Sequence, residues 1–172
     1  MMTLEDRAYT FAMAAHEAVG QVRKYTGEPY IVHPVEVASI VKAVPGATEE
    51  MVAAAYLHDV VEDTQVGIDT IIHLFGPVVA DYVHQLTDPP KVEGGPNRKA
   101  RKALDRQRLA DAPAEVQTIK LADLISNTST IVQFDPSFAK VYLEEKRLLL
   151  EVMTKGDAGL HERASRIVKL DK

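Results

Sequence analysis

The segment YLHDVVEDT, residues 56–64, carries two adjacent pairs of ionisable residues. Residues four apart share a helix face, so a helix here would place His58 beside Glu62 and Asp59 beside Asp63. The surrounding residues are mostly alanine, valine and leucine, which predicts a buried helix. An unpaired buried charge is costly, and a divalent cation held by the imidazole and the carboxylate would compensate it. The segment therefore points to a metal site.

Two further candidate ligands occur elsewhere in the chain. His33, in EPYIVHP, comes just before a helix that is expected to begin at a proline, and Asp123, in IKLADLISN, lies within an otherwise apolar helical face. Together with His58 and Asp59 they form a set of two imidazoles and two carboxylates. Such a set neutralises a divalent charge and suits manganese, iron, zinc or magnesium.

Each of these residues also has an ordinary structural explanation. A histidine at a helix start is more often not a ligand, and an adjacent His-Asp pair is a two-residue match that occurs by chance in many proteins. A single aspartate is no more specific. The combination and its order along the chain are therefore more informative than any one residue.

Composition limits the classes of protein to be considered. The chain has 172 residues, enough for one domain that buries roughly 70% of its unfolded surface without disulfides. It has no cysteine, no membrane-length apolar run and no apolar leader after Met1, so we expect a cytoplasmic protein without a membrane partner. A net charge of −5 argues against a nucleic-acid polymer as partner, but it allows a local basic pocket for a small anion.

Hydrophobic periodicity predicts helices throughout, without a run of strand alternation, and hence an all-α, compact helical bundle that forms one domain over residues 1–172. Thr3 is expected to cap the first helix, and Thr48 a helix that reaches Asp63 or Thr64. The other expected helices start at Pro34, Ile68, Pro77, Arg98, Pro113, Pro136 and about Leu160.

Loops are expected at residues 21–32 and at the segment DPPKVEGGPN, residues 88–97. The second combines proline, glycine and charge, so we expect it to form a mobile lid. The aliphatic residues of the last two helices indicate either bundle packing or a contact in a homo-oligomer.

Several segments together resemble a known family. RKYTGEPYIVHP, AAAYLHDVVEDT, a following FG, LTD, a basic helix and IKLADLISN occur in the order and approximate spacing of the HD-domain metal-dependent phosphohydrolases, and in particular of the RelA/SpoT-type hydrolase domain. The resemblance covers roughly residues 15–127. It extends to many positions beyond the candidate metal ligands.

The resemblance implies a mainly helical fold and hydrolysis of the alarmones ppGpp and pppGpp on the 3′ side. The products would be GDP or GTP and pyrophosphate. It also implies that manganese is bound by His33, His58, Asp59 and Asp123. Glu62 and Asp63 would orient or activate the attacking water, and Arg23 would lie against the nucleotide base.

The chain also departs from this family. It is too short for the synthetase and regulatory domains of the long enzymes, so it most resembles the stand-alone small alarmone hydrolases. Where the family often has a basic residue after LAD and a tyrosine before the asparagine, this chain has Leu124 and Ser126, whereas Asn127 is kept. These changes concern the expected nucleoside pocket and therefore the base preference.

Positive charge for the substrate phosphates is available in two places. Arg98, Arg101 and Lys102, with Lys99, are spaced so that at least two face one side of a helix. Such a helix is as often a solvated surface as a phosphate site. Arg23 and Lys24 lie in the loop before Pro29, and only the resemblance favours a ligand contact for Arg23.

Three functions remain open from the sequence. The first is a manganese-dependent alarmone hydrolase. The second is an HD phosphohydrolase that acts on another nucleotide, such as the adenosine counterparts of the alarmones. The third is a non-enzymatic nucleotide-binding module. The intact Glu62-Asp63 pair disfavours the third, because a sensor has no need for a water-positioning pair beside its metal.

Overall fold

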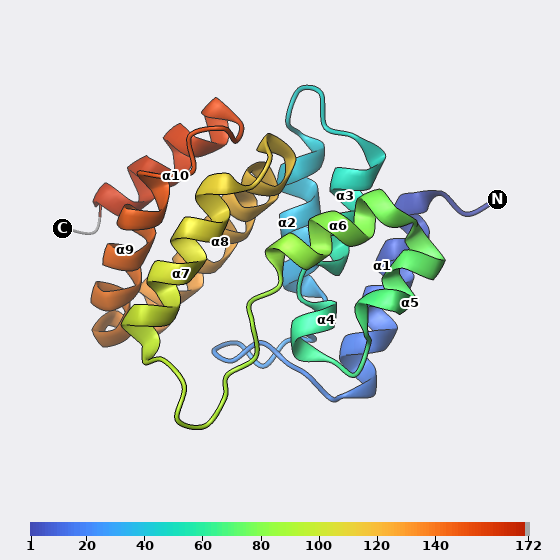
Figure 1. Cartoon of the computed structure of the whole chain (residues 1–172), viewed down its shortest axis with the longest axis horizontal. Helices are drawn as coiled ribbons and strands as arrows, with labels where there is room; N and C mark the ends of the chain where they lie inside the picture. The colour runs from blue at the N-terminus through green and yellow to red at the C-terminus, as the bar shows by residue number, and fades with distance from the viewer. Residues whose placement is uncertain (171–172) are drawn as a thin grey trace. The chain divides into compact units, whose positions relative to one another are not determined.

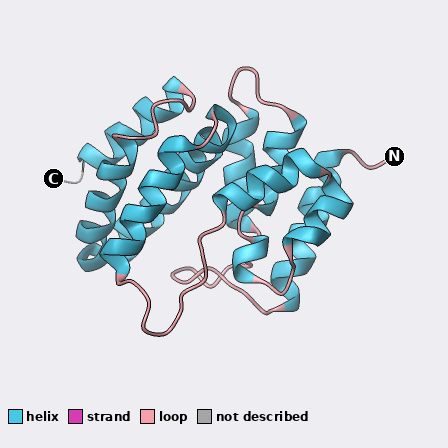
Figure 2. Ribbon diagram, viewed as in Figure 1, coloured by secondary structure: helices cyan, strands magenta, loops and turns pink. Residues whose placement is uncertain are grey.

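This computed structural model describes residues 1–170. All secondary-structure elements in these residues are helices (Figures 1 and 2). The one strand-like pairing found there is an isolated antiparallel bridge between Val22 and Pro29. The prediction of an all-α fold is confirmed. No helix within these residues is both long and apolar enough to cross a membrane.

The chain divides into two compact units at Thr87 and Asp88. The first unit contains α1 (Leu4–Ala18), α2 (Val32–Lys42), α3 (Glu49–Leu57), α4 (Val60–Asp63), α5 (Ile68–Phe75) and α6 (Pro77–Leu86). The second unit contains α7 (Arg98–Asp111), α8 (Ala114–Phe134), α9 (Pro136–Leu150) and α10 (Ala158–Leu170). The single domain over residues 1–172 stays a prediction.

Helix α3 is the centre of the first unit, because it packs against α1, α2 and α6. Thr48 caps it by accepting a hydrogen bond from the backbone N–H of Met51, as the sequence predicts. Every residue from Met51 to Leu57 is buried, and three consecutive alanines allow the neighbouring helices to approach closely. The residues that follow α3 therefore start from a rigid position.

The predicted single helix from Thr48 to Asp63 is wrong in one respect. The structure interrupts it at His58 and Asp59, so that α3 ends at Leu57 and the one-turn helix α4 begins at Val60. The imidazole Nδ1 of His58 donates to the carbonyl oxygen of Ala55 over 2.7 Å and occupies an acceptor that the helix would otherwise use. The interruption places the two candidate ligands in a turn between helices.

Helix α8 is the corresponding centre of the second unit, where it packs against α9 and α10. Its fully buried Gln117 connects three segments: the amide donates to the carbonyl oxygen of Leu109 over 2.8 Å and accepts from the backbone N–H groups of Lys155 and Gly156. This side chain satisfies backbone groups that would otherwise be buried without partners. It thereby fixes the connection between α9 and α10.

Most predicted boundaries agree with the structure to within a few residues. Residues 88–97 form a loop, as expected, and its role as a mobile lid stays a prediction. Helix α2 begins at Val32 rather than at Pro34, so His33 lies inside the first turn of the helix. A proline is tolerated in a first turn because the N–H that it lacks would have no helical acceptor there.

Candidate metal centre

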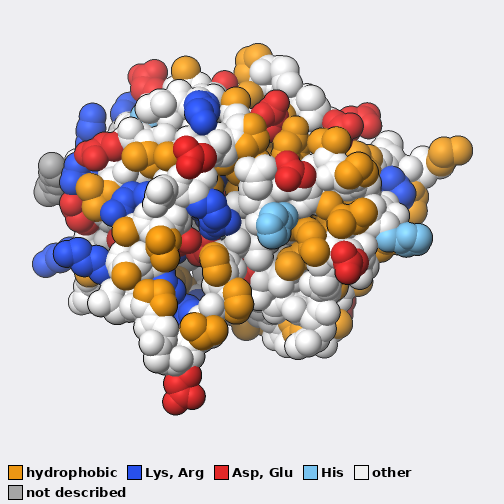
Figure 3. Space-filling view, viewed as in Figure 1, with side chains coloured by type: hydrophobic (Ala, Val, Ile, Leu, Met, Phe, Trp, Pro, Cys, Tyr) orange, Lys and Arg blue, Asp and Glu red, His pale blue; other side chains and the backbone are white. Residues whose placement is uncertain are grey.

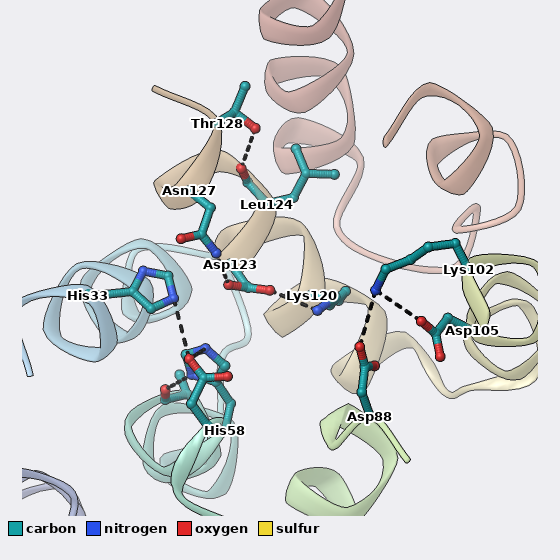
Figure 4. Close-up of polar contacts among 12 residues, drawn as sticks. His33, His58, Asp88, Lys102, Asp105, Lys120, Asp123, Leu124, Asn127 and Thr128 are labelled. Carbon is teal, nitrogen blue, oxygen red and sulfur yellow. Dashed lines mark hydrogen bonds and ion pairs between the residues drawn. The ribbon is translucent and has the colours of Figure 1, made fainter. Parts of the chain in front are cut away.

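Three of the four predicted ligands come together in the first unit. His33, His58 and Asp59 each offer one ligand atom, and these atoms lie within 4.8 Å of one another. Nε2 of His58 is 3.0 Å and Nε2 of His33 is 3.7 Å from Oδ2 of Asp59 (Figure 4 shows the two imidazoles). Both histidines are almost completely buried, whereas the Asp59 side chain is 20% exposed. The cluster therefore retains one accessible side.

Hydrogen bonding determines which imidazole nitrogen of His58 can bind a metal. Nδ1 must carry the hydrogen, because its partner, the Ala55 carbonyl oxygen, can only accept. In the neutral imidazole Nε2 then carries a lone pair that faces the carboxylate oxygen of Asp59. Two facing lone pairs repel each other, and either a proton on Nε2 or a metal ion bound to both atoms removes this repulsion. The donor set therefore fits a metal ion.

Tyr30 supports this cluster from the loop before α2. Its hydroxyl donates to Oδ2 of Asp59 over 2.6 Å, and its ring lies edge-on to the ring of His33, with centroids 5.9 Å apart. Hydrogen bonds of this kind to a ligand carboxylate fix its rotamer. The sequence does not indicate Tyr30 as part of the site, because nothing in its spacing points to a partner 29 positions away.

The second acidic pair lies on α4, directly after the cluster. Glu62 and Asp63 are both exposed as residues. The carboxylate of Asp63 nevertheless accepts a hydrogen bond from the side-chain amide of Gln21 over 3.0 Å. Partial burial of this carboxyl group, together with the negative charge of Asp59, raises the pKa of Asp63 above its ordinary value. A carboxylate with a raised pKa is a better proton acceptor than an ordinary one.

The fourth predicted ligand, Asp123, belongs to the second unit. It lies on α8 with a residue exposure of 7%, and its two carboxylate oxygens accept from Lys120 over 2.8 Å and from Asn127 over 2.7 Å (Figure 4). Its membership of the metal site stays a prediction. The same α8 turns carry Leu124 and Ser126, both almost completely buried.

Two of the predicted basic residues of α7, Arg98 and Lys102, have carboxylate partners within the second unit. Arg98 forms a bidentate ion pair with Glu145, at 2.7 and 2.8 Å, and lies over the ring of Phe138. Lys102 Nζ lies between the carboxylates of Asp88 and Asp105, at 3.2 and 3.1 Å (Figure 4). These ion pairs are made inside the unit, so they position α7 whether or not a ligand binds.

Three other residues that are predicted to contact the substrate lie against a carbonyl group or an aromatic ring. Arg101 donates to the carbonyl oxygen of Pro96. In the loop after α1, the guanidinium of Arg23 lies 5.8 Å from the centre of the Tyr30 ring, and Lys24 lies over the ring of Tyr25. The stacking on Tyr30 brings Arg23 close to the residue that supports Asp59. The substrate roles of all three stay predictions.

Comparison with protein families provides a direct test of the expected relationship. Residues 8–147, more than three quarters of the chain, match the family described as HD domain. The chain belongs to the HD-domain family. The match includes His33, His58, Asp59 and Asp123. The family and the cluster in the first unit together indicate a divalent metal.

Two curated relatives are similar to most of this chain but are much longer proteins. A probable guanosine-3′,5′-bis(diphosphate) 3′-pyrophosphohydrolase of Synechocystis sp. is 36% identical over 132 residues, which cover 76% of this HD-domain chain and 17% of that protein. A guanosine-3′,5′-bis(diphosphate) 3′-pyrophosphohydrolase of Aquifex aeolicus is 37% identical over 144 residues, which cover 82% and 18%. The chain therefore spans less than one fifth of the length of these relatives.

A solved structure of similar size is also closely related in fold. It is that of a metazoan ortholog of SpoT that hydrolyses ppGpp and plays a role in starvation responses. The TM-score is 0.85 at 25% identity, and the match covers 99% of this chain and 96% of that one. A crystal structure of lmo0812 from Listeria monocytogenes EGD-e matches with a TM-score of 0.69 at 26% identity over 86% of this chain. The fold is therefore that of known HD-domain proteins.

Proposed function

We propose that this HD-domain protein is a manganese-dependent alarmone hydrolase, which converts ppGpp to GDP and pppGpp to GTP and releases pyrophosphate in each case. The similarity to the metazoan ortholog of SpoT carries the proposal. That protein hydrolyses ppGpp, and the match covers 96% of its chain rather than a part of a much longer one. The names of the Synechocystis and Aquifex relatives support the same substrate and the same side of cleavage.

His33, His58, Asp59 and Asp123 would hold the ion, the last of them from the second unit. A divalent ion bound there would polarise the phosphoryl group and lower the pKa of a coordinated water. Manganese is the choice that mixed imidazole and carboxylate ligands allow and that the family resemblance favours. Under this proposal the two units act together as one hydrolase domain over residues 1–172.

Glu62 and Asp63 would act on the attacking water. The water oxygen forms a bond to the phosphorus next to the 3′ oxygen of the nucleotide, and the bond between that phosphorus and the 3′ oxygen breaks. The carboxylate pair accepts the proton that the water loses, and the departing 3′ oxygen acquires a proton to become a hydroxyl group. The raised pKa of Asp63 supports this role, because it brings the carboxylate closer to the pH at which it must accept a proton.

Basic and polar residues would bind the nucleotide. Arg23, stacked near Tyr30, would lie against the base, with Lys24 beside it and Asn127 at the nucleoside. Arg101 and Lys102 would approach the phosphates, and Arg98 would contribute only if its ion pair with Glu145 opened. We infer no binding of a nucleic-acid polymer or a membrane. A cytoplasmic location and self-association stay predictions from the sequence.

Product analysis of the purified protein tests the proposal. ppGpp, pppGpp and their adenosine counterparts are each incubated with the metal-stripped protein, with and without added Mn²⁺, and the products are separated by ion-exchange chromatography. We expect GDP and pyrophosphate from ppGpp, in amounts that rise together and only when the metal is present. Release of orthophosphate, or no turnover of any of the four nucleotides, would contradict the proposal.

The adenosine alarmones are the second candidate substrates. Leu124 and Ser126 replace residues that the family often has at the expected nucleoside pocket, so the base contacts can differ from those of the guanosine enzymes. Rapid cleavage of the adenosine analogue together with indifference to ppGpp would move the assignment to this substrate and leave the metal chemistry unchanged.

A further inference from the structure

A buried histidine on α1 connects the first helix to α4. His16 is 1% exposed, and the other buried residues of α1 are Ala8 and Ala12, so the imidazole occupies a position of an otherwise apolar stripe. Its Nδ1 lies 2.7 Å from the side-chain carbonyl oxygen of Gln21, which follows the end of the helix. The amide nitrogen of Gln21 in turn donates to Asp63 over 3.0 Å. The three side chains form one hydrogen-bond chain.

The direction of this chain follows from its last member. The carboxylate of Asp63 can only accept, so the NH₂ group of Gln21 must face it and the amide oxygen must face His16. An amide oxygen also only accepts, so Nδ1 of His16 must carry a hydrogen. Burial lowers the pKa of His16, which keeps the ring neutral near pH 7. The structure thus specifies the Nδ1–H tautomer of a neutral imidazole.

A purely structural role for His16 would be better met by leucine. Burial removes both imidazole nitrogens from bulk water, which costs free energy unless hydrogen bonds compensate it. Leucine would fill a similar space without this cost. The hydrogen bond to Gln21 is one that leucine could not make, so this bond accounts for a polar side chain here.

Helix α4 needs support of this kind because of its length. It has four residues, a single turn, and one helical turn is not stable by itself. Tyr30 holds its N-terminal flank through Asp59, and Gln21 holds its last residue through Asp63. The rings of His16 and Tyr30 are in contact, with centroids 4.6 Å apart, so both supports belong to one packed group. Side chains from outside α4 therefore fix both of its ends.

We propose that His16 and Gln21 are positioning residues, which hold the Asp63 carboxylate and with it the short helix that carries Glu62. This inference rests on the proposed function, in which that acidic pair orients the attacking water. His16 acts through Gln21, and Gln21 through Asp63. Loss of either contact would allow the acidic pair to move while Asp59, which accepts its own hydrogen bond from Tyr30, stayed in place.

The tautomer of His16 is measurable without metal or substrate. Two-bond ¹H–¹⁵N correlation spectra of the metal-free protein distinguish a protonated imidazole nitrogen from an unprotonated one. We expect His16 to be neutral with its hydrogen on Nδ1, and we expect Gln21→Leu to change this signal because the acceptor is lost. A hydrogen on Nε2, or no response to Gln21→Leu, would overturn the chain.

Kinetics then separate positioning from general structure. Gln21→Leu should lower kcat roughly ten- to hundredfold, because small displacements of catalytic groups have effects of this size. KM and Mn²⁺ affinity by calorimetry should stay within about twofold, since the ligands are not displaced. His16→Leu should act in the same direction, and His16→Asn should restore part of kcat, because its amide N–H can replace Nδ1–H. The matched control is Gln85→Leu, which removes a similar bond to Asp81 on α6.

The outcomes also distinguish this inference from the proposed function. Wild-type protein that turns over no alarmone contradicts the function, and the spectra still decide whether the hydrogen-bond chain exists. Active wild-type protein with a Gln21→Leu variant no worse than Gln85→Leu overturns the positioning role. A loss of Mn²⁺ affinity that matches the loss of kcat overturns it as well, because the contact would then serve the metal.

Discussion

The hydroxyl of Tyr30 and the imidazole of His58 both lie against a single oxygen atom, Oδ2 of Asp59, at 2.6 and 3.0 Å. A carboxylate oxygen has room for two partners in its plane, so a donor on one side leaves the other side for a cation. The Tyr30 hydrogen bond thus selects the rotamer of Asp59 in which Oδ2 faces both histidines. Pre-organisation of this kind strengthens metal binding without adding a ligand.

Tyr30→Phe should therefore weaken the binding of Mn²⁺ about 10- to 100-fold while the protein stays folded. Calorimetric titration of the metal-stripped protein measures this affinity directly. Tyr56→Phe is the matched control, because the Tyr56 hydroxyl lies 3.4 Å from Glu5 and does not contact the cluster. Equal affinity of the Tyr30 variant and the wild type would show that Asp59 needs no such support.

Asp123→Ala should leave the protein without bound metal. The remaining ligands, two neutral imidazoles and one carboxylate, carry only one negative charge and do not balance a divalent cation. Metal content is measured by mass spectrometry on protein whose helical circular dichroism is normal. Asp81→Ala, which removes an exposed carboxylate from α6, should retain the full metal content. Full occupancy in the Asp123 variant would remove that residue from the site.

Glu62→Gln should retain metal and nucleotide binding and lose turnover. Glutamine keeps the shape of the side chain but cannot accept a proton, and loss of a general base typically costs about 10² to 10⁴ in rate. Single-turnover rates and equilibrium binding of ppGpp, measured on the same preparation, separate the two effects. A variant with near-normal turnover would exclude the residue from the mechanism, and one without metal would make it a ligand.

Lys146 gives a prediction about the stability of the metal-free protein. Burial and the neighbouring Lys120 lower its pKa from 10.5 to about 8. Between these two pH values the unfolded chain binds more protons than the folded one, so this group makes the protein more stable as the pH rises. At pH 7 the charged form is present in both states, and it disfavours folding.

Lys146→Met should therefore raise Tm at pH 7 by roughly 2 °C or more, and the gain should shrink as the pH rises through 8 towards 10. Thermal unfolding followed by circular dichroism across this range measures the difference. Lys140→Met, on the exposed side of the same helix, should change Tm little at any pH. A gain that is the same at pH 7 and pH 10 would contradict a lowered pKa.

The sequence predicted those parts of the site that depend on residue type and local order. His58 and Asp59 are adjacent, and His33 precedes a recognisable helix start. The three residues can therefore be proposed as metal ligands from the sequence alone. Hydrophobic periodicity does not predict the break between α3 and α4. The break involves a hydrogen bond from the side chain of His58 to the carbonyl oxygen of Ala55, and periodicity does not report such side-chain contacts.

The supporting residues were missed for a different reason. Tyr30, Gln21 and His16 act through hydrogen bonds, two of which join residues 29 and 42 positions apart. No helical period or motif spacing relates residues that are so far apart in the sequence, so these hydrogen bonds could not be predicted from it. The sequence leaves open whether the charge of α7 serves a phosphate or a solvated surface, because the carboxylates that neutralise Arg98 and Lys102 include Glu145 and Asp88 from other segments of the same unit.

That neutralisation determines how the protein responds to ionic strength. Arg108, like Lys102, is paired with Asp88 and Asp105, and on the face seen in Figure 3 basic side chains are interspersed with acidic ones. A protein that binds a polyanion gains free energy from counter-ion release in proportion to the cations it presents. Of the six basic residues of helix α7, three, namely Arg98, Lys102 and Arg108, are balanced in this way. Because half of these cations are balanced and the chain has a net charge of −5, the protein should leave a heparin column at low salt, so that phosphate recognition rests on short-range contacts rather than on long-range attraction.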